Sequence, residues 1–133
     1  MNKLHIEPLE VEKTKVVISD LQEQEAENGI LLVISGEIDM RDPSEFILPY
    51  LLRIHDEAIA QKVKILSVDF RELSYVNSSG IKTIISWLMK SKSLPGDQGY
   101  KVRIVQNSDI PWQESTFPVI QKLFPELITF SQD

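Results

Sequence analysis

The sequence predicts an α/β domain, a single mixed β-sheet with its helices mainly on one face. Strand-like runs alternate along the chain with segments whose apolar residues recur every three or four positions, the spacing of an amphipathic helix. The first two strand-like runs are joined by a polar turn, which indicates an antiparallel hairpin ahead of the crossover helices. At 133 residues the chain is one domain by size and long enough to bury a core.

The N-terminal third supplies the hairpin. We expect residues 1–15 to form an N-terminal arm or an edge strand, and residues 16–133 to form the domain itself. Lys15–Leu21 is a plausible strand, and the turn that follows ends in Asn28-Gly29, a pair favoured where φ is positive. The continuous apolar run Ile30–Ile34 is typical of a central strand covered on both faces.

The first helix has a clear start signal. Asp42 is a good N-cap, Pro43 suits the first helical position, and Glu45 follows in the first turn. One face is apolar and carries Ile47, Tyr50, Leu51, Ile54 and Ala58. Because a proline inside a helix removes a hydrogen bond, Pro49 predicts a kink, or a short helix followed by a longer one.

The central loop joins a strand over 63–70 to a second helix, with residues 71–76 leading out of the strand. Asn77-Ser78-Ser79-Gly80 lies where the loop becomes the helix. The buried stripe of this helix is expected to contain Ile81, Ile84, Ile85, Leu88 and Met89. A helix start has free N–H groups and a partial positive charge, which suit a capping side chain and equally an added phosphate. Asn77 or Ser78 as a simple cap and Ser78 as a regulatory site both remain open.

The last third predicts two more strands and a helix. Residues 92–100 form a turn-rich connection, and Lys101–Val105 alternates as a half-exposed strand does. Ser115 or Thr116 is expected to begin a short helix that ends at Phe124, before Pro125. Leu127–Phe130 is then a last strand or an extended tail.

Composition excludes several classes of function. The net charge of −6 argues against a nucleic-acid partner, which needs clustered Lys and Arg. Cysteine is absent, so disulfides, zinc–thiolate sites and cysteine nucleophiles are excluded. The N-terminus lacks the apolar core of a signal peptide, and no apolar run is long enough to span a membrane. We therefore expect a cytoplasmic protein without a membrane span.

Candidates for catalysis or metal binding are weak. Glu37 and Asp39 could serve as paired carboxylates, but Asp39 more simply begins a turn and no third ligand is near. His5 and His55 show no ligand spacing, and His55 is expected at the surface or boundary of the first helix. The G-x-S-x-G elbow and the P-loop pattern are absent. The sequence predicts no enzyme, no cofactor and no metal.

The two tryptophans and the outer face of the second helix are candidate partner contacts. Trp87 flanks the buried stripe and is best interpreted as core edge, whereas Trp112 is expected in a loop. Either could instead be a hot spot, since aromatic residues are enriched in interfaces. Three residues point away from the stripe and form a candidate docking surface: Lys82, Thr83 and Ser86.

Two motifs together resemble the STAS domain of bacterial anti-anti-sigma factors. The first is Ile34-Ser35-Gly36-Glu37-Ile38-Asp39, and the second joins Ile65–Phe70 to Leu73–Ile81. The tail 118–130 is similar to the final helix and hydrophobic end of that family. The resemblance covers about residues 16–130 and implies a STAS-like single domain, with a mixed sheet and helices mainly on one face, over residues 16–133.

The resemblance implies a regulatory protein that catalyses nothing itself. In such proteins a serine at the start of the central helix is phosphorylated by a partner serine kinase that often doubles as an anti-sigma factor. A phosphatase reverses the modification, and only the unmodified form binds the partner. By motif position the phosphoacceptor is Ser78, and the domain is expected as a monomer or weak dimer. The implied partner-facing residues are Gly36, Glu37, Asp39, Met40, Asn77, Ser78 and Ser79, with Lys82, Thr83 and Ser86 beside them.

The chain departs from the family pattern at two places. The family usually has Asp before the first serine, and here the residue is Asn77, which keeps the capping ability but loses a charge. Pro49 and the longer stretch before Lys64 also distinguish the first helix. The Asn77 substitution keeps an alternative open, a non-switching STAS scaffold or accessory subunit of a transporter or signalling complex.

Overall fold

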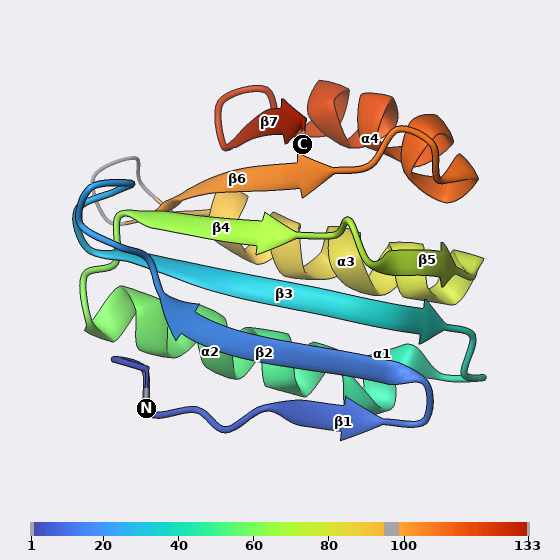
Figure 1. Cartoon of the computed structure of the whole chain (residues 1–133), viewed down its shortest axis with the longest axis horizontal. Coiled ribbons are helices and arrows are strands. Elements are labelled where there is room, and N and C mark those ends of the chain that lie inside the picture. The colour runs from blue at the N-terminus through green and yellow to red at the C-terminus, as the bar shows by residue number, and fades with distance from the viewer. Residues whose placement is uncertain (1, 95–98, 133) are drawn as a thin grey trace.

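The computed structural model describes residues 2–94 and 99–132 of the chain. Along the sequence (Figure 1) its elements are β1 Leu9–Val11, β2 Thr14–Asp20, β3 Gly29–Ile38, α1 Pro43–Phe46, α2 Leu48–Ala60, β4 Ile65–Asp69, β5 Leu73–Val76, α3 Ser78–Lys92, β6 Lys101–Gln106, α4 Pro111–Leu123 and β7 Ile128–Gln132. None of the helices in these ranges is long and apolar enough to cross a membrane.

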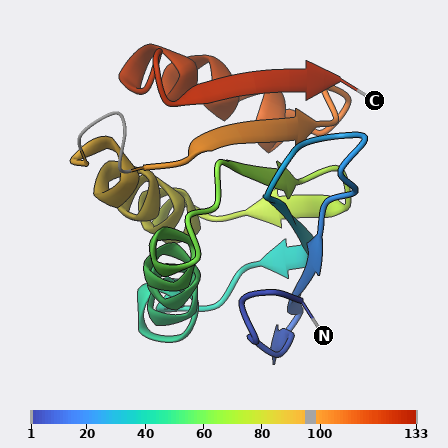
Figure 2. The ribbon, with the colours of Figure 1, turned by 90° about the vertical axis from the view of Figure 1, so that its left-hand side faces the viewer.

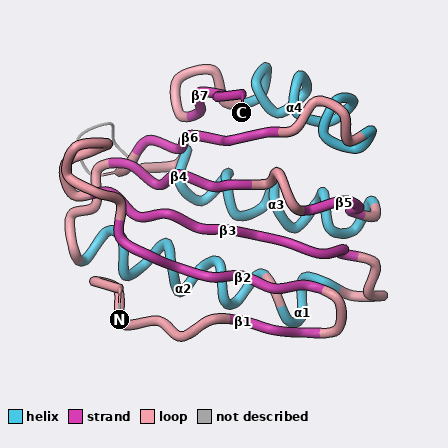
Figure 3. Tube along the Cα trace, in the orientation of Figure 1, coloured by secondary structure: helices cyan, strands magenta, loops and turns pink. Residues whose placement is uncertain are grey.

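One mixed sheet runs through the molecule (Figure 3). Its strands lie in the order β1-β2-β3-β4-β6-β7, and β5 pairs with the far end of β3. The pairs β1–β2 and β2–β3 are antiparallel, and the pairs formed by β3, β4, β5, β6 and β7 are parallel. The predicted hairpin is therefore confirmed, with Asn28 at a φ of 52° in its turn.

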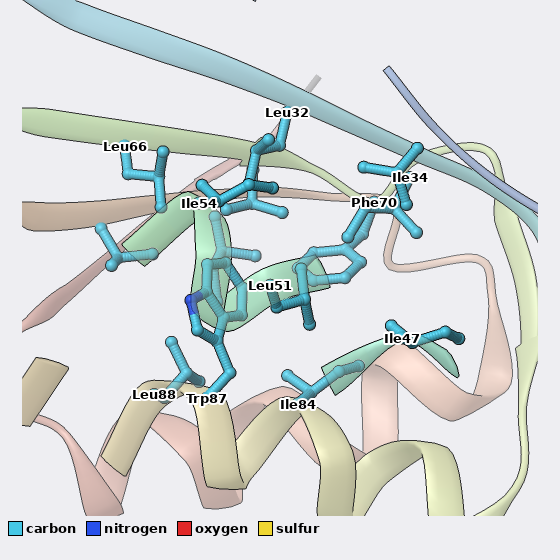
Figure 4. Packing of buried hydrophobic residues seen from close by; sticks show 14 of the residues in the cluster. Leu32, Ile34, Ile47, Leu51, Ile54, Leu66, Phe70, Ile84, Trp87 and Leu88 are labelled. Carbon is cyan, nitrogen blue, oxygen red and sulfur yellow. The ribbon is translucent and has the colours of Figure 1, made fainter. Parts of the chain in front are cut away.

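The helices cover one face of this sheet, as predicted (Figure 2). Alternate residues of β3, which include Leu32 and Ile34, point toward them and are buried. Leu51 and Ile54 of α2 meet the side chains of α3 in the same layer (Figure 4), where Ile84, Trp87 and Leu88 are buried. The hydrophobic core thus lies between the sheet and the helix layer.

The opposite face of the sheet corrects one prediction. Leu31 and Val33 of β3 are only half-buried, so the central strand is not covered on both faces. The strand β5 was also not predicted, because residues 71–76 show no alternation longer than four residues. At the N-terminus β1 is a short edge strand, and the buried side chains of Leu4 and Ile6 belong to the core.

The first helix is divided as Pro49 predicts. A short α1 is followed by the longer α2, whose first turn contains the proline. Asp42 stands at the N-cap of α1, but its side chain makes no capping hydrogen bond. His55 is buried on α2, so its prediction as a surface or boundary residue is wrong.

The last helix begins earlier than predicted. α4 starts at Pro111 rather than at Ser115 or Thr116, so Trp112 is a buried helical residue and not a loop residue. Proline at the first helical position is the start signal that was overlooked. Trp112 and Phe117 pack against Phe70 at the end of β4, with ring centroids 5.8 and 5.4 Å away.

A buried carboxamide ties α4 to the strand ends. Gln113 Nε2 donates hydrogen bonds to the carbonyl oxygens of Phe70 and Leu73, at 2.6 and 3.2 Å. Its Oε1 accepts from the backbone nitrogen of Asn107 at 2.8 Å. Trp112 Nε1 adds a bond of 2.7 Å to the Leu73 carbonyl. These contacts hold the β4–β5 connection, and with it the strand that leads into α3.

Of the predicted connection over residues 92–100, positions 95–98 lie outside the described residues. α3 itself ends at Lys92, and Ser93 is its C-cap.

Candidate functional site

Asn77 caps α3. Its backbone is extended, and its side-chain oxygen accepts a hydrogen bond of 2.7 Å from the backbone nitrogen of Gly80. Ser78 is the first residue of the helix and is exposed, as is Ser79. The capping interpretation is therefore right for Asn77 and not for Ser78. In the described part of the chain the Ser78 hydroxyl makes no hydrogen bond.

The segment after β3 lies against this helix start. Asn77 Nδ2 donates to the carbonyl oxygen of Met40 at 2.9 Å, and the Asn77 backbone nitrogen donates to the carbonyl of Ile38 at 2.9 Å. Ser74 Oγ donates to the Gly36 carbonyl at 3.1 Å. The two motifs that were singled out in the sequence are thus brought together by β3–β5 pairing and by one asparagine side chain.

Gly36 forms a bulge that only glycine fits. Its φ is +93°, and the pairing of β3 with β5 shifts register between Gly36 and Glu37. A Cβ at Gly36 would lie 1.9 Å from the carbonyl oxygen of Lys13. That same oxygen accepts a hydrogen bond from the Glu37 nitrogen at 3.1 Å. The bulge therefore turns the end of β3 toward the site.

Asp39 pairs with Lys13 on the surface. Lys13 Nζ lies 3.1 Å from Asp39 Oδ2. The hydrogen bond and the charge of Asp39 raise the pKa of Lys13 above its ordinary value. An exposed pair of this kind contributes little to stability.

Two of the predicted partner-facing residues are instead in the core. Met40 is buried and belongs to the hydrophobic core. Thr83 is buried on α3, and its Oγ1 donates to the Ser79 carbonyl at 2.9 Å. Among the others, Asp39, Ser78, Ser79, Lys82 and Ser86 are exposed, and Gly36, Glu37 and Asn77 are partly exposed.

The buried stripe of α3 also differs from its prediction. It is centred on Ile84, Trp87 and Leu88, with Gly80 and Ser91 at its ends. Ile81 and Ile85 are half-buried and Met89 is exposed. Trp87 is therefore in the core, and the helix is rotated from the expected orientation so that an apolar flank meets solvent.

Gly80 allows α3 to start close to the sheet. A Cβ there would lie 2.6 Å from Val76 Cγ1 and 2.8 Å from Ile38 Cγ2. Such distances are too short for carbon contacts, so glycine lets the first helical turn sit against β3 and β5. Tyr75, exposed on β5 beside this turn, was not predicted as a site residue. The sequence signal for Tyr75 was an aromatic residue two positions before the Asn77-Ser78-Ser79-Gly80 motif.

His55, Ser91 and Tyr100 form a buried polar cluster that was not predicted from the sequence. His55 Nδ1 lies 2.8 Å from the Tyr100 hydroxyl, and Ser91 Oγ donates to that hydroxyl at 2.6 Å. Burial lowers the pKa of His55 and raises the pKa of Tyr100 to about 12. Within the described residues Trp87 Nε1 makes no hydrogen bond, although the Trp87 side chain acts to lower the pKa of the Tyr100 hydroxyl. This buried cluster joins α2 and α3 to Tyr100, the residue just before β6.

Comparisons with known proteins bear on the fold. No protein-family model matches the chain, and no curated protein matches it. The structure is similar to the crystal structure of an anti-sigma factor antagonist from Mycobacterium paratuberculosis, with a TM-score of 0.55 and 19% sequence identity. The likeness covers 84% of this chain and 83% of that one. The chain therefore has the fold of an anti-sigma factor antagonist, the STAS-type fold that its two sequence motifs resemble.

Proposed function

We propose that the protein is a cytoplasmic regulatory protein, an anti-sigma factor antagonist that binds a serine kinase/anti-sigma partner under control of Ser78 phosphorylation. The observation that carries the proposal is the state of Ser78. It is exposed in the first turn of α3, and Asn77 rather than Ser78 provides the cap. The hydroxyl is thus accessible to a kinase without loss of a structural hydrogen bond.

The helix start suits an added phosphate. In the described part of the chain the backbone N–H groups of Ser78 and Ser79 make no hydrogen bond, so they can donate to phosphate oxygens. A phosphoserine carries about −1.5 to −2 charges. Because the partial positive charge of the helix end offsets part of that charge, the fold itself is expected to tolerate the modification.

Partner binding responds differently to the same charge. In an interface the phosphate would be desolvated, or would meet a partner carboxylate, at a cost of several kcal/mol. About 1.4 kcal/mol corresponds to a tenfold change in affinity. The proposed partner surface comprises the exposed or partly exposed residues Gly36, Glu37, Asp39, Asn77, Ser78, Ser79, Lys82 and Ser86. A phosphatase would restore binding.

Mass spectrometry after incubation with a purified candidate kinase and ATP tests the modification. The expected product carries one phosphate on Ser78, and Ser78→Ala removes it whereas Ser79→Ala does not. The affinity of the kinase for Ser78→Ala and Ser78→Asp is then compared. Equal affinities would contradict the switch.

The alternative function is a non-switching STAS scaffold in a transporter or signalling complex. It is favoured by Asn77, which stands where the related family usually has Asp and whose amide is engaged with the Met40 carbonyl. A chain that stays unmodified with its genomic neighbour kinases but co-purifies stoichiometrically with a larger assembly would support this alternative.

A further inference from the structure

An apolar strip lies on the outer surface of α3 and α4. On α3 it contains Ile81, Ile85 and Met89, which recur every four residues and so share one side of the helix. Lys92 lies on the same side, three residues after Met89. Its Nζ donates to the Leu123 carbonyl at 3.2 Å and sits 5.6 Å from the centre of the Phe124 ring. This flank of α3 therefore faces the C-terminal part of α4.

α4 continues the strip with Val119 and Leu123, again four residues apart. Their exposed fractions are 53% and 42%, and that of Met89 is 50%. In the described part of the chain six large hydrophobic side chains are exposed, and these three are half of them. Isolated exposed apolar residues are ordinary, but a cluster over two neighbouring helices indicates a contact surface. We call Ile81, Ile85, Met89, Val119 and Leu123 the α3–α4 strip.

The charges beside the strip are positive, although the chain carries a net charge of −6. α3 has three lysines and no acidic residue. Lys82 lies next to Ile81 and Ile85, and Lys122 lies one turn from Val119. In the residues that the structure describes, neither Lys82 nor Lys122 forms a salt bridge. Lys82 and Lys122 could therefore form ion pairs with acidic side chains of a bound partner.

We propose that the α3–α4 strip is a docking site for an acidic amphipathic helix of a protein partner. Apolar residues of that helix, at spacings of three and four, would lie on the strip, and its flanking Asp or Glu residues would face Lys82 and Lys122. This docking mode requires only the exposed and half-buried apolar side chains of the strip and the adjacent lysines.

Ser78 lies at one end of the strip. It precedes Lys82 by four residues and Ile85 by seven, so it shares their side of α3. A phosphate on Ser78 would pair with Lys82 and would repel acidic residues of the docked helix. This link between docking and modification rests on the proposed function, whereas the docking site itself does not.

A designed peptide tests the docking site with the full chain. The probe is an amphipathic helix of roughly 18 residues, about five turns, with a leucine stripe flanked by glutamates. A matched peptide has lysine in place of each glutamate. Each is titrated into ¹⁵N-labelled protein and the amide shifts are mapped. We expect saturable shifts that centre on 81–92 and 116–124 with the acidic peptide, and binding weaker by about tenfold or more with the basic one.

Two exposed apolar residues provide the variant and its control. Met89→Lys is expected to weaken the acidic peptide about tenfold or more. Val17→Lys, exposed on the opposite face of the sheet, should keep the affinity within about twofold. Both changes are at the surface, so both variants should fold. Absence of saturable binding up to about 1 mM, equal binding of both peptides, or shifts elsewhere would overturn the proposal.

A second copy of this chain is the competing occupant. Shifts at the strip that depend on protein concentration without peptide, and that Met89→Lys abolishes, would assign the strip to self-association and overturn the proposal. The result of the peptide titration is independent of the result of the kinase assay. A Ser78 that no kinase modifies would defeat the proposed function and leave peptide binding intact, whereas loss of peptide binding would leave the phosphorylation result standing.

Discussion

The Asn77 side chain links the start of α3 to the segment that follows β3, accepting from the Gly80 nitrogen at 2.7 Å and donating to the Met40 carbonyl at 2.9 Å. The first contact requires an acceptor and the second requires a donor. An amide provides both, and a carboxylate provides only the first. This geometry gives a structural reason for asparagine at a position where aspartate would be expected from the family resemblance.

Replacing Asn77 by Asp should therefore lower stability. The aspartate keeps the cap and gains up to about 1 kcal/mol from the helix dipole, but its carboxylate cannot donate to the Met40 carbonyl. Loss of that hydrogen bond and the repulsion of two acceptors leave a net destabilisation of about 1 kcal/mol. Asn77→Ala loses both contacts and should cost about 2 kcal/mol. Urea unfolding measures both variants, and an Asp variant as stable as the parent would contradict this account.

Gly36→Ala should be severely destabilising. The new Cβ would overlap the Lys13 carbonyl oxygen, 1.9 Å away, at a φ of +93° that side chains avoid. Relief requires that the β2–β3 pairing open at the bulge, so we expect a loss of about 3 kcal/mol or more. Gly99→Ala is the control, because its nearest atoms would be 3.6 Å away, an ordinary contact. Comparable urea midpoints for the two variants would show that the bulge adapts.

Local signals in the sequence predict the elements that local chemistry determines. The Asn28-Gly29 turn forms because Asn tolerates the observed φ of 52°. The division at Pro49 and the Asn77 cap likewise depend on the residue and its immediate neighbours. The mixed sheet follows from the hairpin and the later strand–helix alternation, and the structure confirms it.

The predictions that the structure contradicts concern residues whose positions depend on long-range packing. Thr83 and His55 are polar, and only the packing of their helices against other parts of the chain buries them. Met89 is apolar, and nothing in its own helix indicates that it is exposed. The four-residue strand β5 forms because it pairs with the end of β3. Each of these errors comes from a contact between segments that are far apart in sequence.

Gln113→Leu should destabilise the fold although it replaces a buried polar group by an apolar one. The change leaves the Phe70 carbonyl and the Asn107 nitrogen without the bonds that the carboxamide provides. The Phe70 carbonyl keeps its bond from the Leu73 nitrogen, so the Asn107 nitrogen is the group left unpaired. An unpaired group of this kind costs about 1–3 kcal/mol, so we expect a loss of roughly 2 kcal/mol. Gln121→Leu makes the same change at an exposed position of α4 and should be nearly neutral. Equal effects at the two sites would argue against the buried network.

Stability should fall in mild acid because of His55. Burial holds the pKa of this imidazole below its ordinary value of 6.5, with Asp56 raising and Lys90 lowering it. Both the folded and the unfolded states are neutral at His55 well above that pH. As the pH falls through 6.5 the unfolded state binds the proton first, so the free energy of unfolding declines until the lower folded pKa is passed.

A comparison of His55→Gln with the parent isolates this contribution. Urea unfolding at several pH values between 7.5 and 5.5 should give a steeper decline for the parent than for the variant, because glutamine can bond to Tyr100 without titrating. Identical slopes would show that His55 does not take part in the decline.

Negative charge at Ser78 should stabilise the isolated domain even though it is proposed to weaken partner binding. Ser78→Glu places a carboxylate at the helix start, four residues before Lys82, and each of these features favours it. We expect a gain of about 0.5 kcal/mol over Ser78→Gln, which has the same shape without the charge. The gain should shrink at high salt, since the site is exposed. In the Lys82→Ala background the part that depends on the pair should vanish and the helix-dipole part should remain. A charged variant less stable than the neutral one would mean that the helix start rejects an anion. The phosphate would then act by distorting the domain rather than by repelling its partner.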